Sequence, residues 1–227
     1  MPESIPELRL EDIHLDGPDG RPVLTGIDLH LRGGEALLLS GGSGFSRGQF
    51  LRMCGGLTEP GKGRVLLSGV QLWPGEGLAA LRGQVRIGLA FGQGGLVANL
   101  SLLDNLELPL LFGSDQSRER IRDRVMEHLD RFGLAGLADM RPHLLDARST
   151  RLANLIRVKL VDPEIVLLDE PFEELEARDM AEIRIWMEDW LKTPGHILVV
   201  AADDPDPRTY PKLPRAELRD HRLMEAA

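Results

Sequence analysis

The chain has 227 residues, enough for one good-sized core but too few for two large enzymatic domains, so we expect a single domain over residues 1–227. With 42% hydrophobic and 28% charged residues, its composition is that of a folded globular protein rather than a membrane-embedded one. The formal net charge of −9 argues against a nucleic-acid partner, because such proteins concentrate lysine and arginine to neutralise phosphates.

The cysteine content and the start of the chain bear on location. Cys54 is the single cysteine, so no internal disulfide can form, which fits a reduced cytosolic compartment. It lies in an apolar helical stretch, and we interpret it as a core residue. Residues 1–7 lack the pattern of an export signal, and no stretch is apolar for the ~18 residues of a spanning helix. We therefore expect a cytoplasmic protein whose membrane contact is peripheral.

The first third of the chain is predicted to be mostly strands. Residues 8–15 and 23–31 alternate apolar and polar side chains on either side of the turn at residues 17–20, which is typical of a β-hairpin. Residues 35–40 form a short apolar run between glycines, as expected for a strand buried on both faces. A glycine-rich loop and a helix over residues 48–54 follow it.

The remaining two thirds alternate between strand and helix patterns. We predict strand regions at residues 64–72, 84–91, 164–168 and 196–201, mostly helix at 101–160, a helix at 178–191 and a final hairpin turning at 219–222. Ile121, Val125, Leu129 and Phe132 share one helix face and should lie in the core. This alternation favours an α/β fold with a mainly parallel sheet flanked by helices.

Two features together indicate a phosphate-handling site. A later apolar strand ends in Asp169-Glu170, and an earlier strand ends in a glycine-rich loop that opens a helix. The residues of that loop are Gly41, Gly42, Ser43, Gly44, Phe45, Ser46, Arg47, Gly48 and Gln49. In the working form, Gly-x-x-x-x-Gly-Lys-Ser/Thr, backbone N–H groups surround the phosphates, the lysine reaches the outer phosphates and the hydroxyl binds Mg²⁺.

In this order the motifs resemble the ATP-binding subunits of ABC transporters, from about residue 8 to residue 224. Further stretches similar to the family's are Gly34-Glu35, Gly56-Leu57, residues 63–69, 103–106, 162–164 and 217–220. The resemblance implies a P-loop NTPase fold with an N-terminal antiparallel β subdomain and a helical subdomain inserted at about residues 92–160. It also implies ATP and Mg²⁺ as cofactors, and a head-to-tail dimer in which each phosphate loop faces the other subunit's signature.

The phosphate loop departs from the family's pattern at three adjacent positions. Ser46 stands where the second glycine belongs, Arg47 where the lysine belongs and Gly48 where the Mg²⁺-binding hydroxyl belongs. Gly48 cannot ligate a metal, and a planar guanidinium does not replace an ammonium at a tight site. For Arg47 two interpretations stay open: phosphate binding, or a salt bridge to Asp169 that fills the vacant cation site. We favour the salt bridge.

The family's other ATP-handling positions are altered as well. The glutamine expected after Phe91 is Gly92, with Gln93 one position further as an alternative metal contact. The signature Leu-Ser-Gly-Gly-Gln reads Leu-Asp-Ala-Arg-Ser at residues 145–149, where Asp146 would repel a partner's γ-phosphate. The loop after the acidic strand is Glu-Glu-Leu-Glu at residues 173–176, the switch histidine is Ala202, and no aromatic residue between His14 and Gly20 can stack on adenine.

Asp169 and Glu170 alone are intact. If the site works, the resemblance implies that Asp169 and Gln93 contact the metal and that Glu170 is catalytic. If it does not, Asp169 persists because it stabilises a neighbouring loop or helix N-terminus. We weigh these two interpretations equally.

Together these losses leave no complete electrostatic clamp for a transferred phosphoryl group. We therefore expect a pseudo-ATPase, a structural or regulatory subunit at the cytoplasmic face of a membrane transporter. One alternative is a divergent ATPase that uses Arg47, Gln93, Asp169 and Glu170 to drive transport; another is a scaffold without a permease. The expected partners are an ABC-type subunit, either a second copy or a paralogue, and a permease that docks near Gly94–Asn105. That segment is most similar to the Mce/Mla-type lipid-transport branch.

Overall fold

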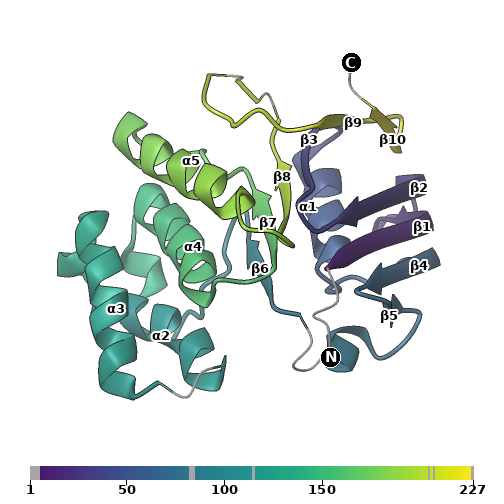
Figure 1. Cartoon of the computed structure of the whole chain (residues 1–227). Coiled ribbons are helices and arrows are strands. Elements are labelled where there is room, and N and C mark those ends of the chain that lie inside the picture. Colours follow the sequence, from purple (N-terminus) through teal and green to yellow (C-terminus); the bar gives the residue numbers. More distant parts are fainter. Residues whose placement is uncertain (1–5, 82–84, 114–115, 204, 207, 226–227) are drawn as a thin grey trace.

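The computed structural model describes residues 6–81, 85–113, 116–203, 205–206 and 208–225 (Figure 1). Its strands form two sheets. The smaller sheet is antiparallel with the order β2-β1-β4-β5, made of β1 (Glu7–Asp16), β2 (Pro22–Arg32), β4 (Lys62–Leu67) and β5 (Val70–Trp73). Residues 8–10 of β1 pair with residues 29–31 of β2, so the predicted hairpin is confirmed.

The larger sheet has six strands in the order β10-β9-β3-β8-β7-β6. They are β3 (Ala36–Gly41), β6 (Ile87–Ala90), β7 (Ile165–Asp169), β8 (Ile197–Ala201), β9 (Arg215–Arg219) and β10 (Arg222–Glu225). All neighbours are parallel except β9 and β10, which form the predicted final hairpin. The predicted strand at residues 84–91 is shorter than expected, and residue 84 lies outside the described residues.

The helices pack on both faces of the six-stranded sheet (Figure 1). They are α1 (Gly44–Cys54), α2 (Leu102–Gly113), α3 (Arg118–Arg131), α4 (Ala147–Val161) and α5 (Ala177–Leu191), with short 3-10 turns η1 (Gly77–Leu81), η2 (Ala135–Leu137) and η3 (Pro142–Leu144). The face of α3 predicted to be apolar is buried as expected. The first helix begins at Gly44, four residues earlier than predicted, because Ser43 caps it.

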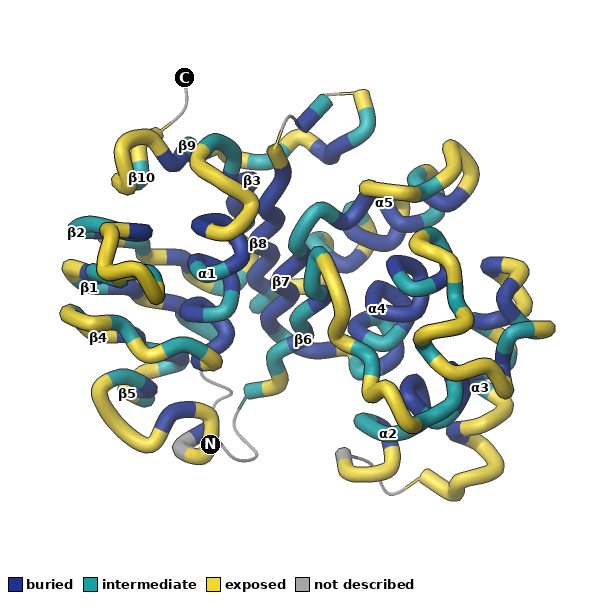
Figure 2. The backbone as a smooth tube through the Cα atoms, turned by 180° about the vertical axis from the view of Figure 1, so that it is seen from behind, coloured by how far each residue is buried: buried dark blue, intermediate teal, exposed yellow. Residues whose placement is uncertain are grey.

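Two hydrophobic cores lie on opposite faces of the six-stranded sheet, which is the dark blue centre of Figure 2. Strand β8 shows the alternation: Leu198 and Val200 face the core with α2 to α5, whereas Ile197 and Val199 face α1 and the antiparallel sheet. Cys54 is fully buried in this second core, as expected, and burial raises the pKa of its thiol. Such two-sided burial explains why these strands are continuous apolar runs.

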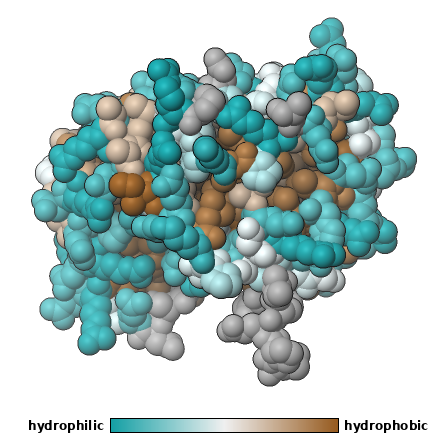
Figure 3. All heavy atoms as spheres, turned by 45° about the horizontal axis from the view of Figure 1, so that its top comes forward, coloured by the Kyte–Doolittle hydropathy of each residue, from teal (hydrophilic) through white to brown (hydrophobic). Residues whose placement is uncertain are grey.

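Hydrophilic residues cover most of the outer surface in Figure 3, and hydrophobic residues gather in the middle of that face. In the described part of the chain, no helix is both long enough and apolar enough to cross a bilayer. Strands β3, β8 and β7 are parallel neighbours, so their carboxyl ends meet at one edge of the sheet. Ligands of open α/β sheets bind at this edge. The predicted phosphate loop follows β3, and the Asp-Glu pair stands at the end of β7, so both lie there.

Candidate functional site

A cavity of about 510 Å³ opens at the carboxyl edge of the six-stranded sheet. Residues from α1, from the end of β6 and from the segments that follow β7 and β8 line it. These are Gly44, Phe45, Arg47, Gly48, Arg52, Gly92, Gln93, Asp169, Glu170, Glu173 and Asp203. The structure therefore brings together four residues of the predicted phosphate loop, the Asp-Glu pair and Gln93 around one space, whereas Gly42, Ser43 and Ser46 line a separate pocket beside Leu218.

At the N-terminus of α1, side chains of the phosphate loop form hydrogen bonds with the loop's own backbone. Gly41 and Gly42 have φ values of 71° and 61°, and a Cβ on Gly41 would lie 2.6 Å from the carbonyl oxygen of Leu218, so glycine is required there. Ser43 is the N-cap, and its Oγ accepts a hydrogen bond from the N–H of Ser46 (3.1 Å). In return, the N–H of Ser43 donates to Oγ of Ser46 (2.9 Å). This capping box uses loop N–H groups that a phosphate would otherwise bind.

Arg47 is turned inward over the loop and is only 3% exposed. Its Nη1 donates to the carbonyl oxygen of Gly41 (2.9 Å) and to Oδ1 of Asp203 (2.8 Å), and its Nη2 donates to Oε1 of Glu170 (2.8 Å). The prediction of a salt bridge from Arg47 was therefore right in kind but wrong in partner: Glu170 and Asp203 hold it, not Asp169. The reason is that Arg47 lies between the ends of β7 and β8, beside the two carboxylates that follow these strands.

Asp169 fills space that two glycines leave open. Its Oδ2 accepts a hydrogen bond from the N–H of Gly92 (3.1 Å), and a Cβ on Gly92 would lie only 2.8 Å from that oxygen. A Cβ on Gly48 would lie 3.5 Å from the same oxygen and 3.0 Å from Nη1 of Arg52. Burial raises the pKa of Asp169, against the opposing effects of the Gly92 N–H and of the nearby arginines. Asp169 thus contacts a neighbouring loop, which is the kind of contact that one of the two interpretations requires.

Glu170 adopts a left-handed backbone conformation, with φ of 48°. Its side chain is 23% exposed and accepts the hydrogen bond from Arg47. Burial raises the pKa of Glu170, and the bond from Arg47 lowers it in part. A general base must reach the proton that it abstracts, whereas this carboxylate is already held by a permanently charged guanidinium.

In the segment that corresponds to the signature, the polar side chains also form hydrogen bonds within the chain. Asp146 is the N-cap of α4, and its Oδ1 accepts a hydrogen bond from the N–H of Ser149 (2.7 Å). Hydrogen bonding with the side chain of Ser149, and then with its N–H, lowers the pKa of Asp146. Arg148 donates two hydrogen bonds, of 2.6 and 2.8 Å, to the buried carboxylate of Asp179. The N-terminus of α4 is therefore capped by a carboxylate, which occupies the position that an anion would take.

Two residues of this region were missed by sequence reasoning. Arg151 is 6% exposed; its Nη1 donates to the carbonyl oxygen of Asp169 (3.0 Å) and its Nη2 to Oε2 of Glu173 (2.7 Å). Asp203 is the second, and it holds Arg47. The available signals were an arginine among the apolar residues of α4 and an acidic residue directly after the apolar strand β8.

The donor set around the cavity does not fit a Mg²⁺ site. Gly48 offers no hydroxyl. Of the four carboxylates that line the cavity, Glu170 and Asp203 are bound by Arg47 and Glu173 by Arg151, which leaves Asp169. Gln93 lines the cavity but is exposed. Over the residues that the structure describes, no group of three or more His, Cys, Asp or Glu side chains is arranged to hold a metal ion. Arginines supply the positive charge at this edge.

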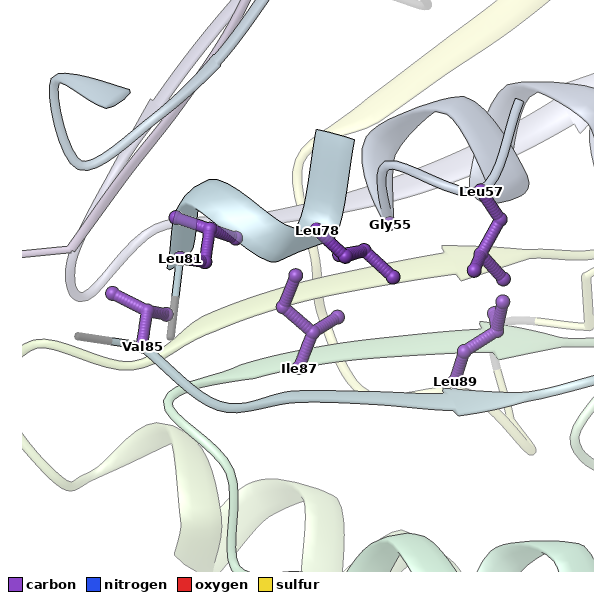
Figure 4. Close-up of a pocket in the computed structure, with 7 residues that line it drawn as sticks. All are labelled: Gly55, Leu57, Leu78, Leu81, Val85, Ile87 and Leu89. Carbon is purple, nitrogen blue, oxygen red and sulfur yellow. The ribbon is translucent and has the colours of Figure 1, made fainter. Parts of the chain in front are cut away.

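A separate apolar groove of about 270 Å³ lies along β6, which is an edge strand (Figure 4). Figure 4 shows side chains from the end of α1, from η1 and from β6 facing one another across it. The lining is Gly55, Leu57, Leu78, Leu81, Val85, Ile87 and Leu89. Leu57 is 49% exposed and Leu78 is 40% exposed, so the groove is open to solvent despite its apolar lining.

The segment Gly94–Asn105, predicted to face a permease, is held in shape by buried amides. Asn105 is 1% exposed; its Nδ2 donates to the carbonyl oxygens of Val97 and Ser101, and its Oδ1 accepts from the N–H of Val97. Asn154 donates from α4 to the carbonyl oxygen of Gly94 (2.8 Å). The loop between β6 and α2 is therefore a fixed surface feature.

Comparison with curated proteins gives relatives among ATP-binding proteins of transporters. The chain is 30% identical over 191 residues to the sulfate/thiosulfate import ATP-binding protein CysA 1 of Agrobacterium fabrum, covering 82% of this chain and 53% of that protein. It is 30% identical over 209 residues to the macrolide export ATP-binding/permease protein MacB of Chlorobium luteolum, covering 90% and 31%. The chain therefore spans about half of the first relative and a third of the second.

A third relative is closer in length. The chain is 28% identical over 197 residues to the lipoprotein-releasing system ATP-binding protein LolD of Chromohalobacter salexigens, covering 86% of this chain and 83% of that protein. The expected likeness to the Mce/Mla-type branch is not confirmed by these relatives.

Solved structures show the same fold. The ATP-binding cassette MJ0796, in a dimeric post-hydrolysis state bound to ADP and Pi, has a TM-score of 0.83 at 23% identity, covering 96% of this chain and 98% of that one. The predicted fold class is thereby confirmed. The family described as ABC transporter matches residues 24–173, a span that includes the phosphate loop, the signature segment and the Asp-Glu pair. This chain belongs to the ABC transporter family, as an ATP-binding domain.

Proposed function

We propose that this chain is a degenerate ATP-binding subunit, a pseudo-ATPase with a structural or regulatory role on a membrane transporter. The observation that carries the proposal is the ion pair between Arg47 and Glu170. In a working site, a carboxylate at the position of Glu170 acts on the attacking water, and a cation at the position of Arg47 acts on the phosphates. Here the two groups are paired with each other, so Glu170 is not available to the attacking water and Nη2 of Arg47 is not available to the phosphates.

Three further observations support loss of hydrolysis. Gly48 has no side chain with which to hold Mg²⁺, and Ala202 has no group to hold a γ-phosphate. Ser43 and Ser46 use each other's N–H groups and oxygens at the start of α1. Electrostatic stabilisation accounts for most of the rate of phosphoryl transfer, and a site that lacks several of its charged contacts at once should be very slow or inactive.

The assembly we propose follows the family. Residues 1–227 form one domain, with about residues 92–160 as an inserted helical unit, and the chain pairs with a second copy or a paralogue. Its transport partner is an integral membrane permease, which places the chain at the cytoplasmic face of the membrane. ATP and Mg²⁺ are the family's cofactors, and of these we expect ATP alone to be relevant to this chain.

The permease contact is proposed at the segment Gly94–Asn105 together with the apolar groove on β6. The groove presents exposed leucines, such as Leu57 and Leu78, beside an edge strand, which suits the apolar face of an amphipathic helix. The fixed loop held by Asn105 adds a preformed polar surface. A rigid docking face of this kind is useful to a subunit whose role is structural.

Hydrolysis by the purified chain tests the proposal. ATP turnover in the presence of Mg²⁺ is measured for the wild type and for Glu170→Gln, with thermal melting to show that both are folded. We expect the same background rate for both proteins. Turnover in the wild type that the substitution abolishes would overturn the proposal.

One observation favours a divergent but working ATPase as the second candidate. Gln93 lines the same cavity as Asp169 and Glu170, where a slipped register would place the family's glutamine. If this function is correct, Gln93→Ala should lower Mg²⁺-dependent turnover as strongly as Glu170→Gln. If the pseudo-ATPase proposal is correct, the wild type has no turnover, and Gln93→Ala has nothing to lower.

A further inference from the structure

Arg47 joins three segments that meet at the carboxyl edge of the six-stranded sheet. It binds its own loop through the carbonyl oxygens of Gly41 and Gly42, the segment after β7 through Glu170, and the segment after β8 through Asp203. The guanidinium of Arg47 thus links the phosphate loop to the segments that follow β7 and β8. Its Nε is buried without a hydrogen-bond partner in the described structure, so the guanidinium is not fully satisfied in this position.

The two carboxylate contacts of Arg47 differ in their exposure to solvent. The side chain of Glu170 is 23% exposed, whereas that of Asp203 is 76% exposed. Water screens an ion pair with an exposed carboxylate, so the contact with Asp203 contributes little and breaks easily. The contact with Glu170 is harder to break, because it would leave buried charges without partners. Asp203 is therefore the contact that opens first.

The charges around the cavity explain what the closed contact does. Two guanidinium groups, Arg47 and Arg52, line the cavity together with four carboxylates: Asp169, Glu170, Glu173 and Asp203. The lining carries more negative than positive charge, and while Arg47 stays on its carboxylates its hydrogen-bond donors are not available to a polyphosphate. The same guanidinium would favour the polyphosphate if it left them, because it is a planar donor suited to phosphate oxygens.

We propose that Arg47 is an intramolecular latch on the phosphate loop. Bound to Glu170 and Asp203, it closes the loop to nucleoside triphosphates. Release from Asp203 frees Nη1 to bind their phosphates, while Nη2 stays on Glu170. This inference rests on the proposed function, since it describes how a site that does not hydrolyse ATP controls whether ATP binds. The chain then senses the nucleotide through the position of one side chain, without turnover.

ATP binding to the full-length chain tests the latch. Dissociation constants for ATP are measured by calorimetry with Mg²⁺ and with a chelator, for the wild type, Asp203→Asn and Glu174→Gln. Asp203→Asn removes an exposed ion pair, so the variant should bind ATP about fivefold more tightly than the wild type. Glu174→Gln is the matched control: it removes one negative charge from the neighbouring exposed loop, and no contact with Arg47 is described for Glu174.

A double variant separates the latch from simple loss of charge. In Asp203→Asn combined with Arg47→Met, the gain should disappear, because the group that binds the phosphates has been removed. The latch is wrong if Asp203→Asn binds ATP no better than the wild type, if Glu174→Gln gains equally, or if the double variant keeps the gain. Turnover measured on the same samples decides the proposed function separately, since a change in binding does not depend on hydrolysis.

Discussion

Nη2 of Arg47 lies 2.8 Å from Oε1 of Glu170, although 123 positions separate the two residues in the sequence. The pair is formed by the start of α1 and the end of β7, two elements that pack against each other beneath the cavity. A buried arginine is stable only when its charge is compensated, and here the compensation comes from the carboxylate that the family pattern assigns to catalysis.

Removing that carboxylate should destabilise the fold. We expect Glu170→Ala to lower the free energy of unfolding by about 2 kcal/mol, because Arg47 stays buried with one partner fewer while Asp203 still holds it. Urea unfolding followed by tryptophan fluorescence measures this. Glu174→Ala, at an exposed position of the same loop, should change the same quantity by less than about 0.5 kcal/mol. Equal effects of the two substitutions would show that the ion pair contributes nothing.

The sequence predicted the architecture well because its signals are local. The alternation in β1 and β2 and the apolar run in β3 each follow from which faces are buried, and chain order with family likeness supplied the rest. The partners of Arg47 could not be predicted in the same way. Asp169, Glu170 and Asp203 all follow parallel strands that end at the same edge, so sequence places each of them near Arg47.

Backbone geometry at the strand ends decides among these carboxylates. Glu170 has a positive φ, and Asp169 is drawn toward the N–H of Gly92, where the missing side chain leaves room. Neither property has a signal in a single sequence. Arg151 has a signal, as an arginine among the apolar residues of α4, but its partners lie in other segments and have none: the backbone oxygens of Phe91 and Asp169 and the carboxylate of Glu173.

Asp146 provides a test of the signature segment. Because its side chain caps α4 through the N–H of Ser149, Asp146→Ala should lower the free energy of unfolding by about 1 kcal/mol. Asp146→Asn should keep nearly all of the stability, since asparagine is an equally good N-cap. Thermal and urea unfolding of both variants give the comparison. If the two substitutions destabilise equally, the negative charge matters rather than the cap, and the pairing described for α4 is incomplete.

The pKa of Asp169 gives a prediction about pH. Burial raises this pKa above its ordinary value of 3.8, so the native state binds the proton more tightly than the unfolded chain does. The contribution of Asp169 to stability is therefore most favourable at low pH, and it declines as the pH rises from 3.8 through the native pKa. In Asp169→Asn the contribution of residue 169 to stability does not decline with pH, because asparagine does not titrate, and its side-chain oxygen can still accept the hydrogen bond from the N–H of Gly92.

The melting temperatures of wild type and Asp169→Asn should accordingly diverge as the pH rises. We expect the variant to gain on the wild type between about pH 4 and neutrality, and to keep that gain at pH 7. Differential scanning calorimetry at several pH values measures the difference. A variant that loses stability relative to the wild type over this range would mean that the nearby arginines stabilise the Asp169 carboxylate more than burial penalises it.

Gly88 tests how tightly the helical layer packs on the sheet. It lies in β6, and a Cβ at this position would come within 2.7 Å of Cγ of Pro163 and of Cγ1 of Val158 on α4. Gly88→Ala should therefore lower the free energy of unfolding by about 2 kcal/mol, because strand and helix must move apart. The matched control is Gly136→Ala, where a Cβ would meet no atom within 4 Å and stability should stay the same or rise slightly. Unfolding in urea distinguishes the two variants, and a neutral Gly88→Ala would show that β6 and α4 can move apart without cost.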